Sequence, residues 1–377
     1  MIVNKLELNN FRNLKPASLE FSPGFNLIIG KNAQGKSSFL EALYSLSLGR
    51  SYRTNKEENI INFDSSFARV AGSFAVGGLA FSLEIQWEKP ESTRLNKTIK
   101  LNSNPVTRLS DFIARSPMVL FLAEDLEIIR GAPENRRKLL DLICSRLKPV
   151  YASTLREYNK ILDLRNRWLK LPERNRDKYM GEIYSEKLIS LGAEILCHRF
   201  QALESLRKIM TQIFIDLFKQ DMPKLGYRSS VKEFKNREPE SLKEAFSDAL
   251  QRLEQSENKV GYTLAGPHRD DIVFKKDGKR IRNFGSLGEI RGVSVVLKLA
   301  EAEIISQQMD IEPVILIDDS LRELDPSRVD LFINFIKAKK QIFFAATEIP
   351  EFFKNHGSRT RLFNVSEGVI SNATHVY

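Results

Sequence analysis

Two spacings of apolar residues alternate along the chain and predict a mixed α/β fold. Apolar and polar residues alternate over Ile2–Leu8 and Ala68–Trp87, the period of half-buried strands, and Gly77-Gly78 marks a hairpin turn in the second stretch. Short, mainly apolar runs predict buried strands at Phe25–Ile29, Met118–Leu122, Val314–Ile317 and Ile342–Ala346. Shorter signals predict strands at Val260–Leu264 and Asp271–Lys275 and a small hairpin over Arg361–Ser371.

Helical spacing fills the segments between these strands. Helices are predicted over Ser37–Leu48, Gly288–Gln307 and Pro326–Lys337. The block from Pro133 to Lys219 is helical in pattern throughout, with Pro172 separating two helices. Strands at both ends and helices between them predict a sheet built from both ends of the chain and a protruding helical lobe. Residues 1–128 and 259–377 are expected to form the two parts of the lobe that contains the sheet, and residues 129–258 the helical lobe.

Composition narrows the class of protein. Of the 377 residues, 42% are hydrophobic, enough for a buried core. No apolar run approaches the ~20 residues that span a bilayer, and the first residues lack a secretory signal, so a cytoplasmic protein without a membrane partner is expected. The net charge of +10 favours a polyanionic partner such as nucleic acid.

One segment predicts phosphate binding. Residues 30–37 fit G-x-x-x-x-G-K-[ST] between an apolar strand and a helix, the context that this motif requires. Backbone N–H groups and the helix N-terminus would bind the phosphates, Lys36 would add charge at the β- and γ-phosphates, and the Ser37 hydroxyl would ligate Mg²⁺. The predicted ATP site consists of Gly30, Lys31, Asn32, Ala33, Gln34, Gly35, Lys36 and Ser37.

A second strand ends in two carboxylates. The apolar run Val314–Ile317 leads directly into Asp318 and Asp319. An apolar strand would deliver both carboxylates to the sheet edge beside the phosphate loop. Asp318 is predicted to hold Mg²⁺, and Asp319 is predicted to act as general base on the attacking water. A solvated acidic turn after a core strand is the alternative.

The residues Ser286-Leu287-Gly288-Glu289 resemble the S-x-G-[QE] signature of ABC and SMC-type ATPases, and the segment ending in Asp325 resembles their D-loop. This resemblance implies an α/β fold: an ABC-type P-loop ATPase head, SMC-like without a long coiled coil, with an inserted helical lobe. Ser286, Gly288 and Glu289 of one copy would contact the γ-phosphate bound by the other, although an ordinary helix cap is the alternative for Ser286. Ala33 replaces the middle glycine that is usual in this branch and would be strained if its φ were positive. Thr347-Glu348 stands where the superfamily has its switch histidine, so slow hydrolysis is expected.

Four further segments resemble the RecF family of bacterial DNA repair proteins. They are Leu8–Asn13, the run from Glu124-Asp125-Leu126 through Arg136-Arg137 to Asp141, Gly266–Asp271, and Asp318-Asp319 with Leu324-Asp325. The signature departs from the family pattern at Glu289, Ile290 and Arg291. The resemblance implies an ATP-dependent homodimer that engages double-stranded, single-stranded or junction DNA. It also implies roles in recombination, replication and the SOS response, partnership with RecO and RecR, and weak DNA-dependent ATPase activity.

Basic residues concentrate in the helical lobe. Between Arg130 and Lys178, fourteen basic and six acidic residues give +8, most of the chain's +10. A basic helical face could follow a DNA backbone, although charge runs usually form solvated faces. The candidate DNA contacts are Arg136, Arg137, Lys138, Arg165 and Arg167. Arg12 is a candidate phosphate contact or a surface arginine in a turn. The segment His268–Asp271 is expected to form a structural ion-pair cluster, with a metal site as the alternative, and Glu124 is a candidate for the position of the ABC Q-loop glutamine.

Three other functions remain open from the sequence. A small-molecule kinase would not need the signature, the D-loop or the basic lobe. A transporter ATPase subunit would need a membrane partner and usually the switch histidine. An ATP-binding DNA clamp with negligible turnover is the closest alternative to an active ATPase.

Overall fold

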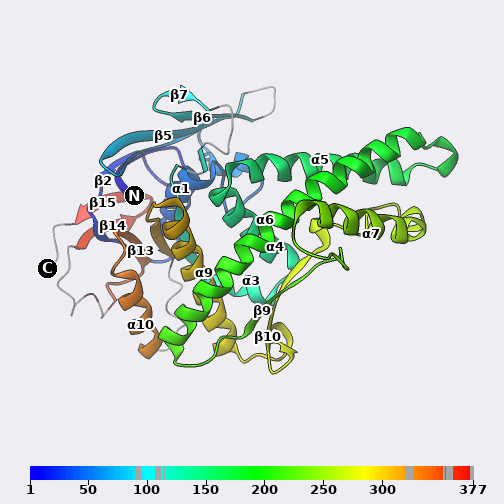
Figure 1. The fold of residues 1–377 in the computed structure, drawn as a ribbon. Coiled ribbons are helices and arrows are strands. Elements are labelled where there is room, and N and C mark those ends of the chain that lie inside the picture. Colours follow the sequence, from blue (N-terminus) through cyan, green and yellow to red (C-terminus); the bar gives the residue numbers. More distant parts are fainter. Residues whose placement is uncertain are drawn as a thin grey trace. The chain divides into compact units, whose positions relative to one another are not determined.

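The computed structural model describes residues 1–90, 95–106, 112–113, 115–318, 326–350, 353 and 360–373 (Figure 1). The chain divides into two compact units. The first consists of residues 1–125 and 298–377, and the second of residues 126–297. The first unit is therefore assembled from both ends of the chain, as the order of predicted strands and helices indicates.

The first unit contains a six-stranded mixed sheet with the order β15-β14-β3-β13-β12-β8. Five strands are parallel, and β15 returns antiparallel to β14 as a hairpin. The strands are β3 (Gly24–Ile29), β8 (Met118–Leu122), β12 (Val314–Asp318), β13 (Gln341–Ala346), β14 (Thr360–Ser366) and β15 (Val369–Ala373). The central strands are buried, which explains their mainly apolar sequences. The two polar side chains buried among them, Asn26 on β3 and Gln341 on β13, both donate to backbone carbonyl oxygens. All four predicted buried strands and the C-terminal hairpin are confirmed.

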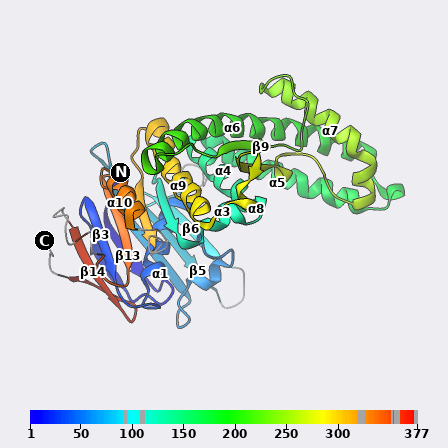
Figure 2. The same ribbon diagram turned by 90° about the horizontal axis from the view of Figure 1, so that it is seen from below.

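A second, antiparallel sheet of the same unit has the order β2-β1-β4-β5-β6-β7. Its strands are β1 (Ile2–Asn9), β2 (Ala17–Glu20), β4 (Phe67–Val76), β5 (Leu79–Glu88), β6 (Asn96–Leu101) and β7 (Asn104–Pro105). Helix α1 (Lys36–Leu48) packs against β4 and β5 of this sheet and against β12 and β13 of the other (Figure 2). Because both sheets cover it, almost every residue of α1 is buried. Helix α10 (Pro326–Ile336) lies between β12 and β13 in the chain.

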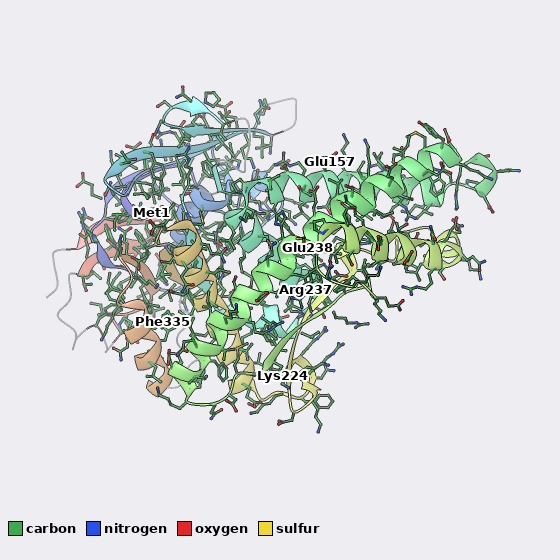
Figure 3. The ribbon with its side chains drawn as sticks, in the orientation of Figure 1. Met1, Glu157, Lys224, Arg237, Glu238 and Phe335 are labelled. Atoms are coloured by element: carbon green, nitrogen blue, oxygen red, sulfur yellow. The ribbon has the colours of Figure 1, made fainter. Side chains whose placement is uncertain are left out.

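The second unit is mainly helical (Figure 1). Its helices are α3 (Leu126–Arg130), α4 (Pro133–Leu147), α5 (Pro149–Lys170), α6 (Lys178–Phe218) and α7 (Pro239–Val260). Helix α6 has 41 residues, about 60 Å of helix, and pairs with α5. Glu157, labelled in Figure 3, marks α5 in this hairpin. The predicted break at Pro172 is confirmed. Within the described part of the chain, no helix is both long and apolar enough to cross a membrane.

A small sheet completes the second unit and changes two expectations. Strands β9 (Lys224–Arg228), β10 (Asp271–Lys276) and β11 (Lys279–Arg280) pair antiparallel, followed by α8 (Ile281–Phe284) and α9 (Leu287–Met309). The predicted strand Val260–Leu264 is wrong, since α7 continues to Val260 and ends at Gly261 with φ 75°. The compact helical unit extends to Leu297 rather than to 258, because β10 pairs with β9.

Candidate nucleotide and DNA sites

The phosphate loop joins β3 to α1 in the first unit. The N-cap of α1 is Gly35, with φ 119°, a conformation that strongly favours glycine, and no side chain caps this helix end. The helix N-terminus therefore presents backbone N–H groups without a competing side-chain acceptor. The Lys36 ammonium lies 2.7 Å from the carbonyl oxygen of Gly30 and 2.9 Å from that of Lys31. A cation and uncapped amides in one loop fit the binding of a phosphate chain.

Ala33 adopts the left-handed conformation that its position in the loop suggests. Its φ is +64°. An L-residue with a Cβ pays roughly 1–2 kcal/mol in this region, whereas glycine enters it freely. Ala33 was expected to be strained if its φ were positive, and its φ is positive.

Replacing Ala33 with glycine is expected to raise the free energy of unfolding of the first unit by about 0.5–1 kcal/mol. The relief of left-handed strain exceeds the extra chain entropy that glycine brings to the unfolded state. Urea denaturation measures the change, and Ala42→Gly in the interior of α1 should act with the opposite sign. A destabilised Ala33→Gly protein would show that the backbone at this position is not strained.

Strand β12, which ends in Asp318, reaches the same edge of the sheet at which the phosphate loop begins. Asp318 lies opposite Ala345 of β13, and Ala346 lies opposite Ile29 of β3. A single strand separates the two, so the backbones of Asp318 and Gly30 are about 10 Å apart. Burial raises the pKa of Tyr52, and the nearby carboxylate of Asp318 raises it further. Asp319 and Asp325, the candidate general base and D-loop residue, lie outside the described residues.

Arg12 contacts a buried carboxylate. Its Nη2 is 2.7 Å from Oε1 of Glu41 on α1, and its Nη1 donates to the carbonyl oxygen of Asn59 at 2.7 Å. Glu41 is fully buried and also accepts hydrogen bonds from the Ser51 hydroxyl at 2.6 Å and from Arg53 at 3.4 Å. The phosphate contact of Arg12 stays a prediction, and a phosphate would share this guanidinium with Glu41.

Tyr52 and Arg53 also lie near the predicted nucleotide site, although no sequence motif marks them. Arg53 is 45% exposed and pairs with Glu41, and burial together with the Asp318 carboxylate raises the pKa of the neighbouring Tyr52. The available signal was Glu41 itself, since a carboxylate between Leu40 and Leu43 in an apolar helix requires a cationic partner.

Glu124 and Asp125 follow β8 at the same sheet edge as Asp318. Leu122 lies opposite Asp318, and the backbone N–H of Leu122 donates to Oδ2 of Asp125 at 2.8 Å. Burial raises the pKa of Asp125 to about 6, against the opposing effect of Lys298. Lys298 forms a buried ion pair with Glu301 on α9. The candidate Q-loop role of Glu124 stays a prediction.

The signature residues form a capping box at the start of α9 in the second unit. Ser286 Oγ accepts from the backbone N–H of Glu289 at 3.2 Å, and the Glu289 carboxylate accepts from the backbone N–H of Ser286 at 2.9 Å. Lys276 lies 2.5 Å from the same carboxylate and lowers the pKa of Glu289. Ser286 is exposed, and its neighbours Phe284 and Leu287 are 70% and 41% exposed. Ser286 and Glu289 therefore do cap the helix. Contact with a second copy stays a prediction for Ser286, Gly288 and Glu289.

Two of the five candidate DNA contacts are buried. Arg136 is 3% exposed and its Nε is 2.7 Å from Oδ1 of Asp271, and Arg165 is 5% exposed and its Nη2 is 2.7 Å from Oε2 of Glu257. The DNA-contact prediction is wrong for these two residues, because separating such a pair would leave a buried carboxylate uncompensated.

The other three candidate DNA contacts are accessible to different degrees. Arg137 is partly buried and donates to the carbonyl oxygen of Asp270 at 2.8 Å. Lys138, 63% exposed, pairs with Glu134 one helical turn away, and Arg167 is exposed. Their contact with DNA stays a prediction.

The segment His268–Asp271 takes part in a buried polar network centred on Arg199. The Arg199 guanidinium is 2.8 Å from Oδ1 of Asp141 and donates to the carbonyl oxygen of Pro267 at 2.7 Å. Asp270 accepts from the Tyr227 hydroxyl at 2.8 Å and from the backbone N–H of Ser230 at 2.7 Å. His268 contacts the Tyr158 hydroxyl at 2.7 Å, and burial lowers its pKa to about 4. These contacts give the segment a structural role inside the second unit.

Comparisons with known proteins agree with this geometry. The family model described as "RecF/RecN/SMC N terminal domain" matches residues 2–371. The DNA replication and repair protein RecF of Oceanobacillus iheyensis is 35% identical over 98% of this chain and 100% of its own length. The RecF of a Geobacillus species is 33% identical over 98% and 99%.

Solved structures give the same assignment. The recombination mediator protein RecF-ATP of the RecFOR pathway has a TM-score of 0.90 and 31% identity, and the match covers 99% of this chain and 97% of that chain. An SMC head bound to the C-terminal winged-helix domain of ScpA has a TM-score of 0.56 at 19% identity and supports the fold alone. The predicted SMC-like ABC head fold and the predicted family are both confirmed: the chain belongs to the RecF family of DNA replication and repair proteins.

Proposed function

We propose that this chain binds ATP at the loop Gly30–Ser37, and that ATP joins two copies into a dimer that engages DNA during recombinational repair. The observation that carries the proposal is the common sheet edge of the phosphate loop and Asp318, which are separated by one strand. The ATP-bound RecF of the RecFOR pathway, which matches nearly the whole chain, supports the same ligand here.

Mg²⁺ would be held by the Ser37 hydroxyl and the Asp318 carboxylate. Oxygen donors of this kind suit Mg²⁺, which would neutralise phosphate charge when bound. Asp319 would orient and deprotonate the attacking water, and Asp325 would belong to the D-loop. Lys36 would hold the β- and γ-phosphates, and the amides of residues 31–37 would surround them.

The second copy would supply the signature. Ser286 offers an exposed hydroxyl at the N-terminus of α9, where the helix dipole favours an anion. Phe284 and Leu287 flank it and are 70% and 41% exposed, as expected for apolar residues that a partner covers. ATP between two copies would therefore be enclosed by the loop of one and the signature of the other. RecO and RecR are the expected further partners, in line with the RecFOR pathway of the solved relative.

DNA would contact the exposed part of the basic block. Exposed cations follow the end of the α5–α6 hairpin at Arg167, Lys170, Arg174 and Lys178. Such contacts are mainly electrostatic, so they depend on salt and not on base sequence.

Replacing Arg167, Lys170 and Arg174 together with alanine is expected to weaken duplex binding and to reduce the slope of log affinity against log salt. Each phosphate contact removed should lower that slope by about 0.9, so three contacts should lower it by nearly 3. Fluorescence anisotropy with a labelled duplex at several salt concentrations measures both effects. The exposed Lys232→Ala variant is the matched control and should change neither. An unchanged slope in the triple variant would place the DNA surface elsewhere.

A clamp that binds ATP without appreciable turnover is the second candidate. The strained Ala33 and the Thr347-Glu348 pair in place of a switch histidine favour it. Asp319→Asn separates the two candidates in a repair assay in cells. Equal repair by the parent and the variant supports the clamp, and loss of repair supports turnover.

A further inference from the structure

The C-terminal hairpin lies directly beside the phosphate loop. β14 pairs in parallel with β3, and Asn364 stands opposite Ile29, the last residue before the loop. The β14–β15 turn, residues 367 and 368, thereby reaches the loop. The backbone N–H of Gly368 donates to the carbonyl oxygen of Gln34 at 3.1 Å, and that of Glu367 donates to Oε1 of Gln34 at 2.5 Å.

The same turn also contacts the segment after β1. The carbonyl oxygen of Gly368 accepts from the backbone N–H of Lys15 at 2.9 Å. Gly368 has φ +78°, and a Cβ at this position would lie 2.0 Å from the carbonyl oxygen of Asn13. Asn13 in turn contacts α1, since the Ser38 hydroxyl lies 3.0 Å from its Oδ1. The turn therefore fits tightly between the phosphate loop and residues 13–15, and only glycine fits at 368.

Gln34 is the residue of the phosphate loop that the β14–β15 turn contacts through hydrogen bonds. Lys31, Asn32 and Ala33 are exposed, whereas Gln34 is half-buried against the hairpin turn. Its two neighbours have positive φ values, +64° at Ala33 and +119° at Gly35. Strained conformations persist only where surrounding contacts fix them. The two hydrogen bonds to Gln34 are placed where they can maintain this loop conformation.

We propose that Gln34 is a positioning residue that couples the phosphate loop to the β14–β15 turn, so that ATP and the C-terminal hairpin stabilise each other. The proposal rests on the proposed binding of ATP at this loop. Hydrogen bonds that hold the loop in its binding conformation remove an ordering cost from ATP binding. By linkage, bound ATP must then hold the hairpin turn more firmly.

Gln34→Met tests the coupling, because methionine keeps the length of the side chain but replaces the amide oxygen that accepts from Glu367 with a sulfur that is only a weak acceptor. We expect the affinity for ATP, measured by calorimetry on the full chain, to fall by about three- to ten-fold, the worth of one hydrogen bond. The thermal midpoint without nucleotide should fall by no more than a few degrees, the effect of losing this one hydrogen bond. In the parent, ATP should slow amide exchange in peptides that cover residues 365–370, and this slowing should be reduced in the variant. Gln34→Asn, one methylene shorter, should behave like Gln34→Met.

Ser366→Ala is the matched control, since Ser366 is exposed on β14 next to the turn. It should leave ATP affinity and hairpin exchange as in the parent. A Gln34→Met protein with a lower thermal midpoint but parental ATP affinity would reveal a purely structural contact and overturn the proposal. The proposal would also be overturned if Gln34→Met bound ATP with the affinity of the parent and ATP did not slow amide exchange in the hairpin of the parent. Failure of the parent itself to bind ATP would instead refute the proposed function.

Discussion

Lys36→Ala is expected to lower the affinity for ATP by at least about a hundred-fold, the effect of losing roughly 3 kcal/mol of charge-assisted contacts to phosphate. The Lys36 ammonium already lies in the loop, within 2.9 Å of two backbone carbonyl oxygens, so it needs only to exchange these acceptors for phosphate oxygens. Calorimetric titration with ATP and Mg²⁺ measures the loss.

Lys56→Ala is the control for charge alone, because Lys56 is an exposed lysine of the same unit. It should bind ATP nearly as the parent does. Comparable losses in both variants would mean that ATP responds to the overall charge of the unit, and nucleotide binding at this loop would then be contradicted.

Arg199→Ala is expected to destabilise the second unit by roughly 3–5 kcal/mol, because it removes a buried cation from the partly buried Asp141 carboxylate and leaves the other polar groups of the network without their donor. Arg199 is 2% exposed and contacts Asp141, Tyr227 and Pro267. Those partners lie on α4, on β9 and at Pro267, so the loss should loosen the packing of α6 against these three segments.

Urea denaturation followed by circular dichroism measures this loss, with Lys208→Ala on the same helix as control. Lys208 is 77% exposed and pairs only across one helical turn with Glu204, which is worth less than about 1 kcal/mol. A change below 1 kcal/mol in Arg199→Ala would show that Asp141 finds solvent or another partner and that the network does not hold the unit together.

The sequence predicts best where one local pattern determines one local structure. The strands before Gly30 and Asp318 are recognisable because buried parallel strands are mainly apolar, and the order of motifs then places both at one sheet edge. The strand predicted at Val260–Leu264 failed because the amphipathic pattern of α7 continues into an apolar β-branched residue before Gly261 ends the helix.

Ion pairs and hydrogen bonds between residues far apart in the chain could not be predicted from the sequence. The partners of Arg136 and Arg165 lie 135 and 92 residues away, so counting charges along the chain could not reveal that both arginines are buried. Gln34 presents the same difficulty, since its partner amide at Glu367 is 333 residues distant. Local motifs identify the chemistry of the phosphate loop, whereas its restraint by the C-terminal hairpin emerges only from the sheet register.

Self-association measured by light scattering, with ATP, with ADP, and with ATP on the Lys36→Ala variant, tests the central claim most directly. The account predicts a dimer for the parent with ATP and monomers in the other two conditions, because the loop of one copy and Ser286 of the other must enclose the same triphosphate. A protein that stays monomeric with ATP, or that is equally dimeric without it, would contradict a nucleotide shared between two copies.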